Sequence, residues 1–393
     1  YYKDWWKMIY LDNSSTTLIK PDVVAKTLYE AVASKKFSNP SRGFYDESIN
    51  SSEKVYDTRE IIADFFGIED PLNIAFTANI TTSLNLVLSS IFKAGDHLIT
   101  SLTEHNSVLR PLYQLEDKGV ELSFIDIDHN FNLKLEELDK YLRKNTKAIV
   151  ITAESNVSGA LTDLDYIYDF AIKHDLLVII DGAQAAGTAK IKFNERKYPR
   201  LIFCLTGHKA LFGPSGTGAI IDLSGEKFKN VFTGGSGVNS FDRFNPELMP
   251  DVFEYGTINF HSIIALAAGV KYIDEIGIER VSDKIHALRK KLFYGIKDIP
   301  GIKLYSNEKN SSIVSFNYKD YPSSEISEKL YKMSKIASRG GIHCAPLFHE
   351  RVGTKNQGIV RLSLSYFNSE DEIDKTINTI KKLKDWSGGT NGI

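Results

Sequence analysis

Asp181 and Lys209 are the residues of this sequence whose types and spacing best suit covalent chemistry. Asp181 ends the apolar run 176–181, and Lys209 lies in the glycine-rich run 206–218. A carboxylate at the end of an apolar strand can keep a pyridinium nitrogen protonated, and a lysine amine can form a Schiff base with an aldehyde. These are two groups that a pyridoxal 5′-phosphate (PLP) site requires. The sequence therefore predicts an enzyme.

The surroundings of Lys209 support the same site. The 28 positions from Asp181 to Lys209 suffice for a strand, a helix and a second strand, so a crossover can place both strand ends side by side. The Gly/Pro/Ser loop 213–218 lets the main chain come close to a ligand. A single lysine is usually an exposed surface residue, but the paired aspartate and the glycine loop favour a functional one. Thr206 and His208, beside this lysine, are predicted to contact the cofactor as well.

Hydroxyl groups at the start of a predicted helix offer a phosphate site. Thr81 and Thr82 follow the strand 73–76, at a helix start where main-chain N–H groups and the helix dipole favour an anion. A helix cap with nothing bound is the more common explanation of a Thr-Thr pair. The aspartate and the lysine elsewhere in the sequence favour the phosphate.

Three more side chains lie near the edge where sheets of this kind bind ligands. His105 follows the strand 97–101 and is predicted to stack on the cofactor ring, although a histidine in such a place is more often structural. Asn156 follows the strand 147–152 and is predicted to reach the ring hydroxyl, although asparagine is also common in turns for main-chain reasons. Gln184 is predicted to donate to the same oxygen.

The two cysteines differ in their surroundings. Cys344 lies among glycines and a proline in 338–347, a constrained loop in which Arg339 and His343 can stabilise a thiolate. Cys204 is embedded in an apolar strand and is predicted to be an inert part of the core. Cys344 is therefore the predicted reactive thiol.

Arg361 is a charge inside an apolar strand pattern, 359–364. Such an arginine needs an anion, and a substrate carboxylate would accept from it bidentately. Arg361, Arg339 and Asn156 form the predicted substrate-binding set.

The elements that must position these residues follow from hydrophobic patterning. Short apolar runs alternate with amphipathic segments, which is typical of a mostly parallel sheet covered on both faces. The predicted strands are 73–76, 97–101, 121–127, 147–152, 176–181, 201–205 and 218–222, with helices at 83–92, 135–143 and 163–174. The predicted fold class is α/β, with a large PLP-binding domain over residues 16–258.

Beyond residue 259 the pattern changes to helices segregated from a few strands, which indicates a smaller α+β domain made of 1–15 and 259–393. The predicted elements there are a long helical stretch from 262 to 276 that runs on to 297, strands at 313–317 and 359–364, and a final helix at 370–386. Residues 1–7 and the polar tail 387–392 are expected to lie outside the fold.

Composition limits the possible partners. The formal charge of −2 gives no electrostatic reason to expect nucleic acid or an anionic membrane. No stretch approaches the ~20 apolar residues of a membrane span. Two cysteines exclude a disulfide framework and suit a reducing compartment, so a cytoplasmic location is expected. No metal site is predicted.

Together these residues resemble a known family. They are similar to the motifs of fold-type I, class V aminotransferase-fold PLP enzymes of the cysteine desulfurase family, close to the SufS branch. The likeness runs over about residues 10–374. Ile342, Pro346 and Tyr255 depart from the SufS pattern and match a cysteine desulfurase-like subgroup. The motifs that carry the likeness are 104–105, 181–184, 207–209, 339–346 and Arg361.

The resemblance implies a mechanism and an assembly. L-Cysteine displaces Lys209 from the cofactor, Arg361 holds the substrate carboxylate, and Lys209 then moves the α-proton. Cys344 attacks the substrate sulfur, which leaves a persulfide on the enzyme and L-alanine as product, with His105 as a proton donor. The family is homodimeric, and Thr257 matches a residue lent to the neighbouring subunit's phosphate site. The short cysteine loop implies a buried persulfide, to which an acceptor protein must come.

Several alternatives stay open. The nearest keep PLP and change the reaction: selenocysteine lyase, another C–S lyase or another class V enzyme. A PLP-binding scaffold without turnover is a different class of protein. It is disfavoured by the presence of Lys209, Asp181 and Arg361. A nucleotide-binding α/β protein is the weakest, because no G-x-G-x-x-G or Walker loop follows the first strand.

Overall fold

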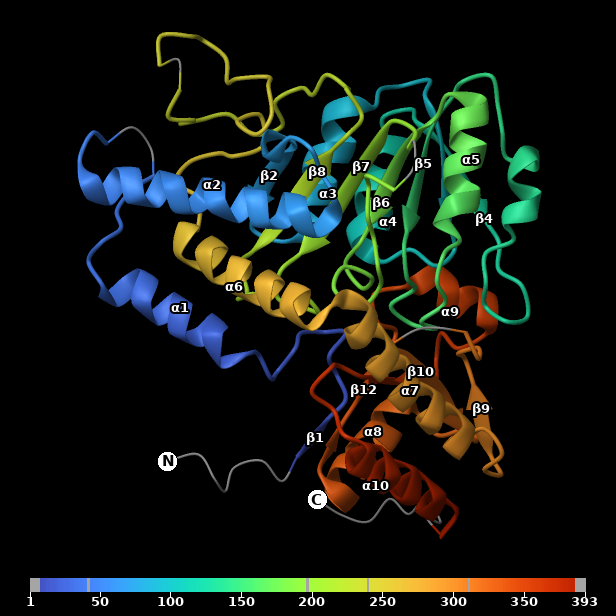
Figure 1. Cartoon of the computed structure of the whole chain (residues 1–393). Coiled ribbons are helices and arrows are strands. Elements are labelled where there is room, and N and C mark those ends of the chain that lie inside the picture. The colour runs from blue at the N-terminus through green and yellow to red at the C-terminus, as the bar shows by residue number, and fades with distance from the viewer. Residues whose placement is uncertain (1–7, 41–42, 196–197, 239, 310–311, 386–393) are drawn as a thin grey trace.

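The computed structural model describes residues 8–40, 43–195, 198–238, 240–309 and 312–385. The extension expected at residues 1–7 and the tail expected at 387–392 lie outside the described residues. Figure 1 shows a large sheet surrounded by helices and, below it, a smaller sheet with its own helices.

A seven-stranded sheet forms the centre of the larger part. Its order is β2-β8-β7-β6-β5-β3-β4, and β8 alone runs opposite to the other six strands. The carboxyl ends of the other strands therefore meet at one edge. The predicted mostly parallel α/β sheet is confirmed, and the strand bounds agree with the prediction to within two residues. The strands are β2 (Ile74–Thr77), β3 (His97–Ser101), β4 (Glu121–Ile125), β5 (Thr146–Thr152), β6 (Leu177–Asp181), β7 (Leu201–Thr206) and β8 (Gly218–Asp222).

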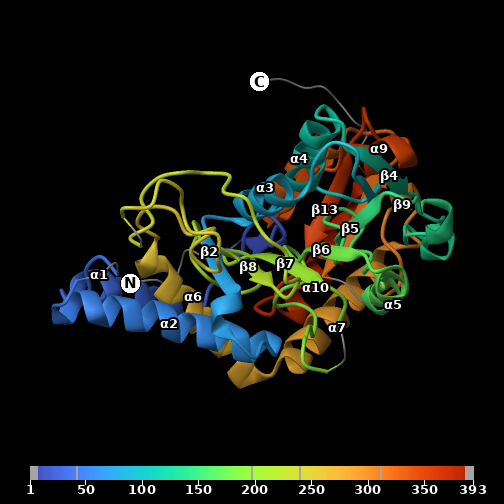
Figure 2. The same ribbon diagram turned by 90° about the horizontal axis from the view of Figure 1, so that it is seen from above.

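Helices cover both faces of the large sheet (Figure 2). In β5, Ile149 and Ile151 belong to a core cluster with α2, α5 and α6, whereas Ala148 and Val150 belong to a cluster with α3 and α4. Because both faces are covered, the strands are apolar throughout. The helices are α2 (Asp46–Phe66), α3 (Ile80–Ile91), α4 (Asn106–Glu116), α5 (Leu164–His174) and α6 (Phe260–Ile276).

The smaller part has a four-stranded antiparallel sheet of order β12-β13-β10-β9. Its strands are β9 (Ile302–Leu304), β10 (Ile313–Tyr318), β12 (Arg339–Gly341) and β13 (Ile359–Ser363), with helices α7 (Ile278–Ile296), α8 (Ser323–Ser334) and α10 (Glu370–Lys381). β1 (Ile9–Tyr10) pairs in parallel with β11 (Ile336–Ala337), so the first strand of the chain joins this late part. The remaining elements are α1 (Asp22–Ala33), α9 (Pro346–Val352) and the 3₁₀ turns η1 (Pro71–Asn73), η2 (Leu135–Lys140) and η3 (Lys382–Asp385).

Two helix predictions need correction. The helical stretch expected to run from 262 to 297 is broken at Gly277, whose φ of +87° is one that side-chain-bearing residues rarely adopt. The helix expected at 135–143 is the 3₁₀ segment η2. Its two buried leucines, Leu135 and Leu138, are three residues apart, and a 3₁₀ helix places such residues on one face.

Helices α6 and α7 connect the two sheets (Figure 1). α6 packs against α1 and α2, and α7 packs against β10 and α10. The division into residues 16–258 and residues 1–15 plus 259–393 stays a prediction. In the described part of the chain, no helix is both long and apolar enough to cross a lipid bilayer.

Candidate active site

A cavity of ≈ 620 Å³ lies at the edge where the parallel strands end. Both sheets and the N-terminal segment supply its walls, so residues far apart in sequence meet there. Most of the predicted site residues line it, whereas Asp181, Thr206 and Thr257 do not. The lining residues are Ser14, Ser15, Asn79, Ile80, Thr81, Thr82, His105, Asn156, Gln184, His208, Lys209, Arg339, His343, Cys344 and Arg361.

We name the wall that belongs to the seven-stranded sheet, with Lys209, His105 and Gln184, together with the buried Asp181, the lysine side. Asp181 ends β6, and its carboxylate accepts a 2.9 Å hydrogen bond from the Ala183 N–H. Burial raises the pKa of Asp181, although the main-chain bond and Lys209 oppose this. Burial lowers the pKa of Lys209 to about 8, with Asp181 opposing and Arg361 adding to the effect. An amine that is partly neutral near pH 8 is a suitable nucleophile for an aldehyde.

His105 caps α4 with its ring. Its Nδ1 accepts a 3.0 Å hydrogen bond from the Ser107 N–H and lies 2.8 Å from the Ser107 hydroxyl. Because a main-chain N–H can only donate, Nδ1 carries no proton, and the neutral ring must carry its proton on Nε2. Burial, together with Lys209 and Arg361, lowers the pKa of His105 to about 4. The ring is therefore neutral at physiological pH and is a hydrogen-bond donor through Nε2.

Helix α3 begins at the cavity wall, three residues earlier than predicted. Asn79 is its cap, and the Asn79 side chain accepts a 3.0 Å hydrogen bond from the Thr82 N–H. Thr81 and Thr82 line the cavity from the first turn, as the predicted phosphate site requires. Asn79 is not among the predicted site residues, although an asparagine directly before a helix is a known cap signal.

We name the opposite wall, with Arg339, Arg361, His343 and Cys344, the arginine side. Arg361 is buried in the middle of β13, directly opposite Arg339 of β12. Its Nη2 donates to Asp12 Oδ1 at 2.9 Å and to Ser15 Oγ at 2.8 Å, and its Nη1 donates to the Asn156 carbonyl at 3.0 Å. The anion that this arginine was expected to need is thus supplied in part by the chain itself, through Asp12.

Cys344 is exposed in the single chain, which corrects the expectation of a buried persulfide. Both His343 and Cys344 have positive φ, at 51° and 55°. Two hydrogen bonds hold this uncommon backbone: the Asn156 Nδ2 donates to the His343 carbonyl at 2.7 Å, and the Asn106 N–H donates to the Cys344 carbonyl at 2.7 Å. The thiol is therefore on a fixed turn anchored to the lysine side.

His343 cannot stabilise a Cys344 thiolate by positive charge, as was expected from the sequence. Its Nε2 lies 2.8 Å from the Ile359 carbonyl, to which it donates, so its Nδ1 carries no proton. Burial, aided by Arg361, lowers the pKa of His343 to about 3. A neutral ring cannot supply positive charge to a Cys344 thiolate, which leaves Arg339 as the cation that the sequence analysis named for this purpose.

The N-terminal segment 12–20 is the part of the site that the sequence analysis missed. Thr16, Thr17 and Lys20 donate to the His208 carbonyl, and Thr17 Oγ1 also donates to the Lys209 carbonyl at 3.0 Å. This strap, residues 12–20, thus holds the main chain of Lys209. Its only visible signal in the sequence is a hydroxyl-rich run after the first apolar residues.

Of four further predicted cofactor contacts, two line the cavity and two do not. Gln184 lines the cavity, but its Nε2 donates to the Ser14 carbonyl at 3.2 Å. His208 also lines it, with Nδ1 3.1 Å from Thr16 Oγ1. Thr206 is buried and donates to the Thr217 carbonyl at 3.4 Å. Thr257 lines an adjacent cavity of ≈ 390 Å³, of which Thr82 is also a wall.

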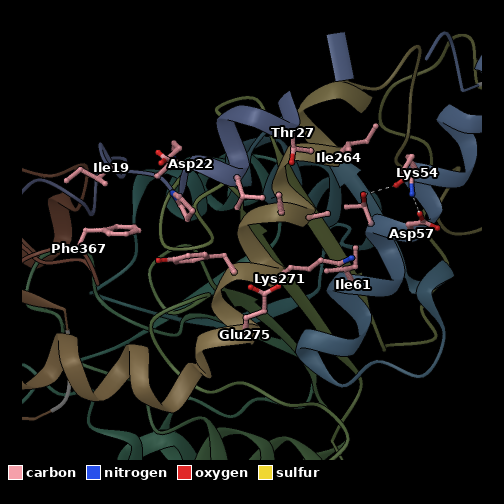
Figure 3. Close-up of a pocket in the computed structure, with 17 residues that line it drawn as sticks. Ile19, Asp22, Thr27, Lys54, Asp57, Ile61, Ile264, Lys271, Glu275 and Phe367 are labelled. Atoms are coloured by element: carbon pink, nitrogen blue, oxygen red, sulfur yellow. Dashed lines mark hydrogen bonds and ion pairs between the residues drawn. The ribbon is translucent and has the colours of Figure 1, made fainter. Parts of the chain in front are cut away.

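A larger cavity of ≈ 720 Å³ lies elsewhere, between α1, α2 and α6 (Figure 3). Its walls mix apolar side chains such as Ile61 and Ile264 with charged ones, and Lys54 and Asp57 pair with each other at 2.6 Å. None of the predicted site residues lines it. Size therefore does not identify the reactive site in this molecule, and the grouping of Lys209, His105 and Cys344 does.

The smaller cavity fits PLP. Its volume lies within the ≈ 300–1,000 Å³ of small-ligand pockets, and its lining includes a lysine, two arginines and a helix start. Asn156 Oδ1 is buried and has no hydrogen-bond partner among the described residues, so it is free to accept from a ring hydroxyl. In the same described ranges, no group of three or more His, Cys, Asp and Glu side chains is placed to hold a metal ion.

Comparison with known proteins identifies the family of the chain. Residues 9–376 match the family model described as aminotransferase class-V. A probable cysteine desulfurase of Pyrococcus abyssi is 31% identical over 96% of this chain and 94% of its own, and a cysteine desulfurase of Wigglesworthia glossinidia is 30% identical over 96% and 93%. The apo structure of a cysteine desulfurase from Thermococcus onnurineus superimposes with a TM-score of 0.89 at 30% identity, covering 96% of this chain and 94% of the other. The chain belongs to the class-V aminotransferase family, whose members are PLP-dependent.

Proposed function

We propose that this protein is a PLP-dependent cysteine desulfurase, which converts L-cysteine to L-alanine and receives the sulfur on Cys344 as a persulfide. The observation that carries the proposal is one cavity that holds Lys209, the arginine pair and an exposed thiol on a fixed turn. The relatives named as cysteine desulfurases support it, since they align over nearly the whole chain.

The residues of the chain have distinct parts in this reaction. Lys209 and Asp181 would hold the cofactor ring, and Thr81 and Thr82 its phosphate. PLP, when bound, supplies an electron-poor ring that stabilises negative charge at the carbon beside the substrate amine. The neutral form of Lys209 takes the α-proton, and the pKa lowered to about 8 makes that form available near neutral pH.

Substrate orientation falls to the arginine side. Arg361 and Arg339 bind the carboxylate, which turns the substrate sulfur towards Cys344. The Cys344 thiolate attacks that sulfur, so the new S–S bond forms while the C–S bond breaks. The electron pair of the C–S bond stays with the carbon, which takes up protons to become L-alanine, and His105 donates one of them from Nε2. No outside oxidant is needed, because the thiolate and the substrate sulfur end as a persulfide while the carbon is reduced.

The proposal includes a homodimer and a sulfur acceptor. Large apolar side chains stand in solvent on the single chain, among them Phe44 at 99%, Phe241 at 102% and Leu248 at 79% exposure. Where such side chains gather into one patch, they are typical of a subunit interface. The exposed position of Cys344 suits transfer of the persulfide sulfur to an acceptor thiol. The cytoplasmic location stays a prediction.

The two cysteines supply a matched test. Alanine and sulfide are measured from L-cysteine with a reductant, using PLP-loaded wild type, Cys344→Ala and Cys204→Ala. Cys204 is fully buried, so its variant controls for loss of a thiol as such. We expect equal alanine and sulfide from wild type and Cys204→Ala, and neither from Cys344→Ala.

Other outcomes would point to the alternatives. Undiminished turnover by Cys344→Ala would indicate direct elimination, and a wild type active only on L-selenocysteine would indicate a selenocysteine lyase. No turnover of any amino acid, without spectral change on their addition, would indicate a PLP-binding scaffold.

A further inference from the structure

Ser15 contacts both arginines of the cavity, although neither its type nor its position suggests chemistry. Its Oγ accepts from Arg339 Nη1 at 2.7 Å and from Arg361 Nη2 at 2.8 Å, and it donates to Asp12 Oδ1 at 2.7 Å. One hydroxyl thus uses its donor and both its acceptor positions on three charged groups. Ser15 also lines the cavity, so this junction lies where a ligand would bind.

The donors of Arg361 are largely occupied by the protein. Both hydrogens of Nη2 are used, one by Asp12 and one by Ser15, and one hydrogen of Nη1 is used by the Asn156 carbonyl. A guanidinium makes a two-point contact with a carboxylate only through faces that include Nη2. With both Nη2 hydrogens occupied, Arg361 alone cannot bind a carboxylate bidentately. This corrects the bidentate contact expected from the sequence.

Arg339 can provide the second point of contact. It lies directly opposite Arg361 in the antiparallel pair of β12 and β13, where two like charges would repel each other. Asp12 forms an ion pair with Arg361 at 2.9 Å, so the negative charge of one carboxylate balances only one of the two guanidinium charges. The two arginines together therefore keep one excess positive charge. The Ser15 hydroxyl, which bridges them, holds the exposed Arg339 side chain beside the buried Arg361.

We propose that Ser15 is a positioning residue of the anion site: it holds Arg339 against Arg361 so that the two guanidinium groups bind one carboxylate together. The inference rests on the proposed function, in which that carboxylate belongs to the amino-acid substrate. Ser15 itself makes no contact with the reacting bonds.

The test compares ligands that differ in the carboxylate. PLP-loaded wild type, Ser15→Ala and Ser15→Thr are titrated with L-alanine and with cysteamine, an amine and thiol without a carboxylate, and the cofactor absorbance reports binding. We expect Ser15→Ala to weaken L-alanine binding about tenfold, as for loss of a hydrogen bond to charged groups. Cysteamine binding should stay unchanged, and Ser15→Thr, which keeps the hydroxyl, should bind L-alanine as wild type does.

Turnover adds a second criterion. The KM of Ser15→Ala for L-cysteine should rise about as much as the L-alanine dissociation constant, with kcat nearly unchanged, because Ser15 acts on binding. Ser90→Ala is the matched control, since its buried hydroxyl donates within α3 to the Val87 carbonyl, away from the arginines.

Equal weakening of L-alanine and cysteamine by Ser15→Ala would overturn the proposal, because it would show general damage to the site. Unchanged binding of both ligands would overturn it as well. A wild type that binds neither L-alanine nor L-cysteine would instead refute the proposed function, and the inference with it.

Discussion

The lysine side and the arginine side of the cavity are positioned in different ways. On the lysine side, Asp181 and His105 are fixed by main-chain N–H groups two residues further along the chain. On the arginine side, Arg361 is held by Asp12 and Ser15, 349 and 346 residues away. Local geometry thus sets the side chains of Asp181 and His105, whereas long-range contacts set the side chain of Arg361.

The largest effect should come from the lysine side. Lys209→Ala removes both the amine that would bind the cofactor covalently and the proton carrier, so alanine formation should fall by about 10²–10⁴-fold or more. Borohydride treatment followed by peptide mass spectrometry should find PLP attached to Lys209 in wild type and no attached PLP in the variant. Attachment to another lysine in wild type would contradict the assignment.

Substitutions on the arginine side should change the KM for L-cysteine and, for the buried arginine, the free energy of unfolding. Arg361→Met should raise the KM for L-cysteine by about 10–100-fold and lower the free energy of unfolding by about 2 kcal/mol, because Asp12 loses its charged partner. Arg339→Met should raise KM but change the unfolding free energy by less than about 0.5 kcal/mol, since Arg339 is exposed. Steady-state kinetics and urea unfolding separate the two. Equal loss of stability in both variants would remove the distinction between the buried and the exposed arginine.

The pH dependence of cofactor uptake tests the lysine side more finely. The pKa of Lys209 is lowered to about 8, so the amine is mostly protonated and unreactive below pH 8 and mostly neutral above it. The rate at which the cofactor-free protein takes up PLP, followed by absorbance, should rise about tenfold from about pH 7 to about pH 9 and then level off. A rate still rising steeply towards pH 10.5, the ordinary value for lysine, would show that burial does not shift this group.

The smallest effect concerns the cap of α3. Asn79→Ala frees the Thr82 N–H and should lower the free energy of unfolding by about 1 kcal/mol. Asn79→Ser and Asn79→Asp can still cap the helix and should lose less. Urea unfolding of the cofactor-free protein measures this directly, and an unchanged midpoint in Asn79→Ala would mean that the cap contributes nothing.

The two sides also differ in how far they could be predicted from sequence. The strands of the large sheet were predicted because residues such as Ile149 and Val150 are buried on both faces, which leaves a continuous apolar run. His105 and Lys209 follow such runs, so their place at the sheet edge could be expected. The break at Gly277 was missed, because the apolar pattern continues across it from Ile276 to Ile278.

The contacts of Asp12 and Ser15 could not be predicted in this way. They depend on a parallel pairing of β1 with β11, two residues long on each side, and short pairings leave no period in the sequence. The partner of Arg361 was consequently sought in the substrate alone. The neutral state of His343 was missed for a similar reason, since it follows from burial and from the Ile359 carbonyl.

The strap has a consequence for the order in which a growing chain becomes active. All seven strands of the large sheet have been synthesised by residue 222, but the strap must wait for Arg361 and Ser363, near the end of the chain. Domains generally fold as they emerge, amino-terminal parts first. Here residues 12–20 precede the whole large sheet in the sequence but complete their contacts after it, so a nascent chain carries its reactive lysine before its arginine side can bind an amino acid.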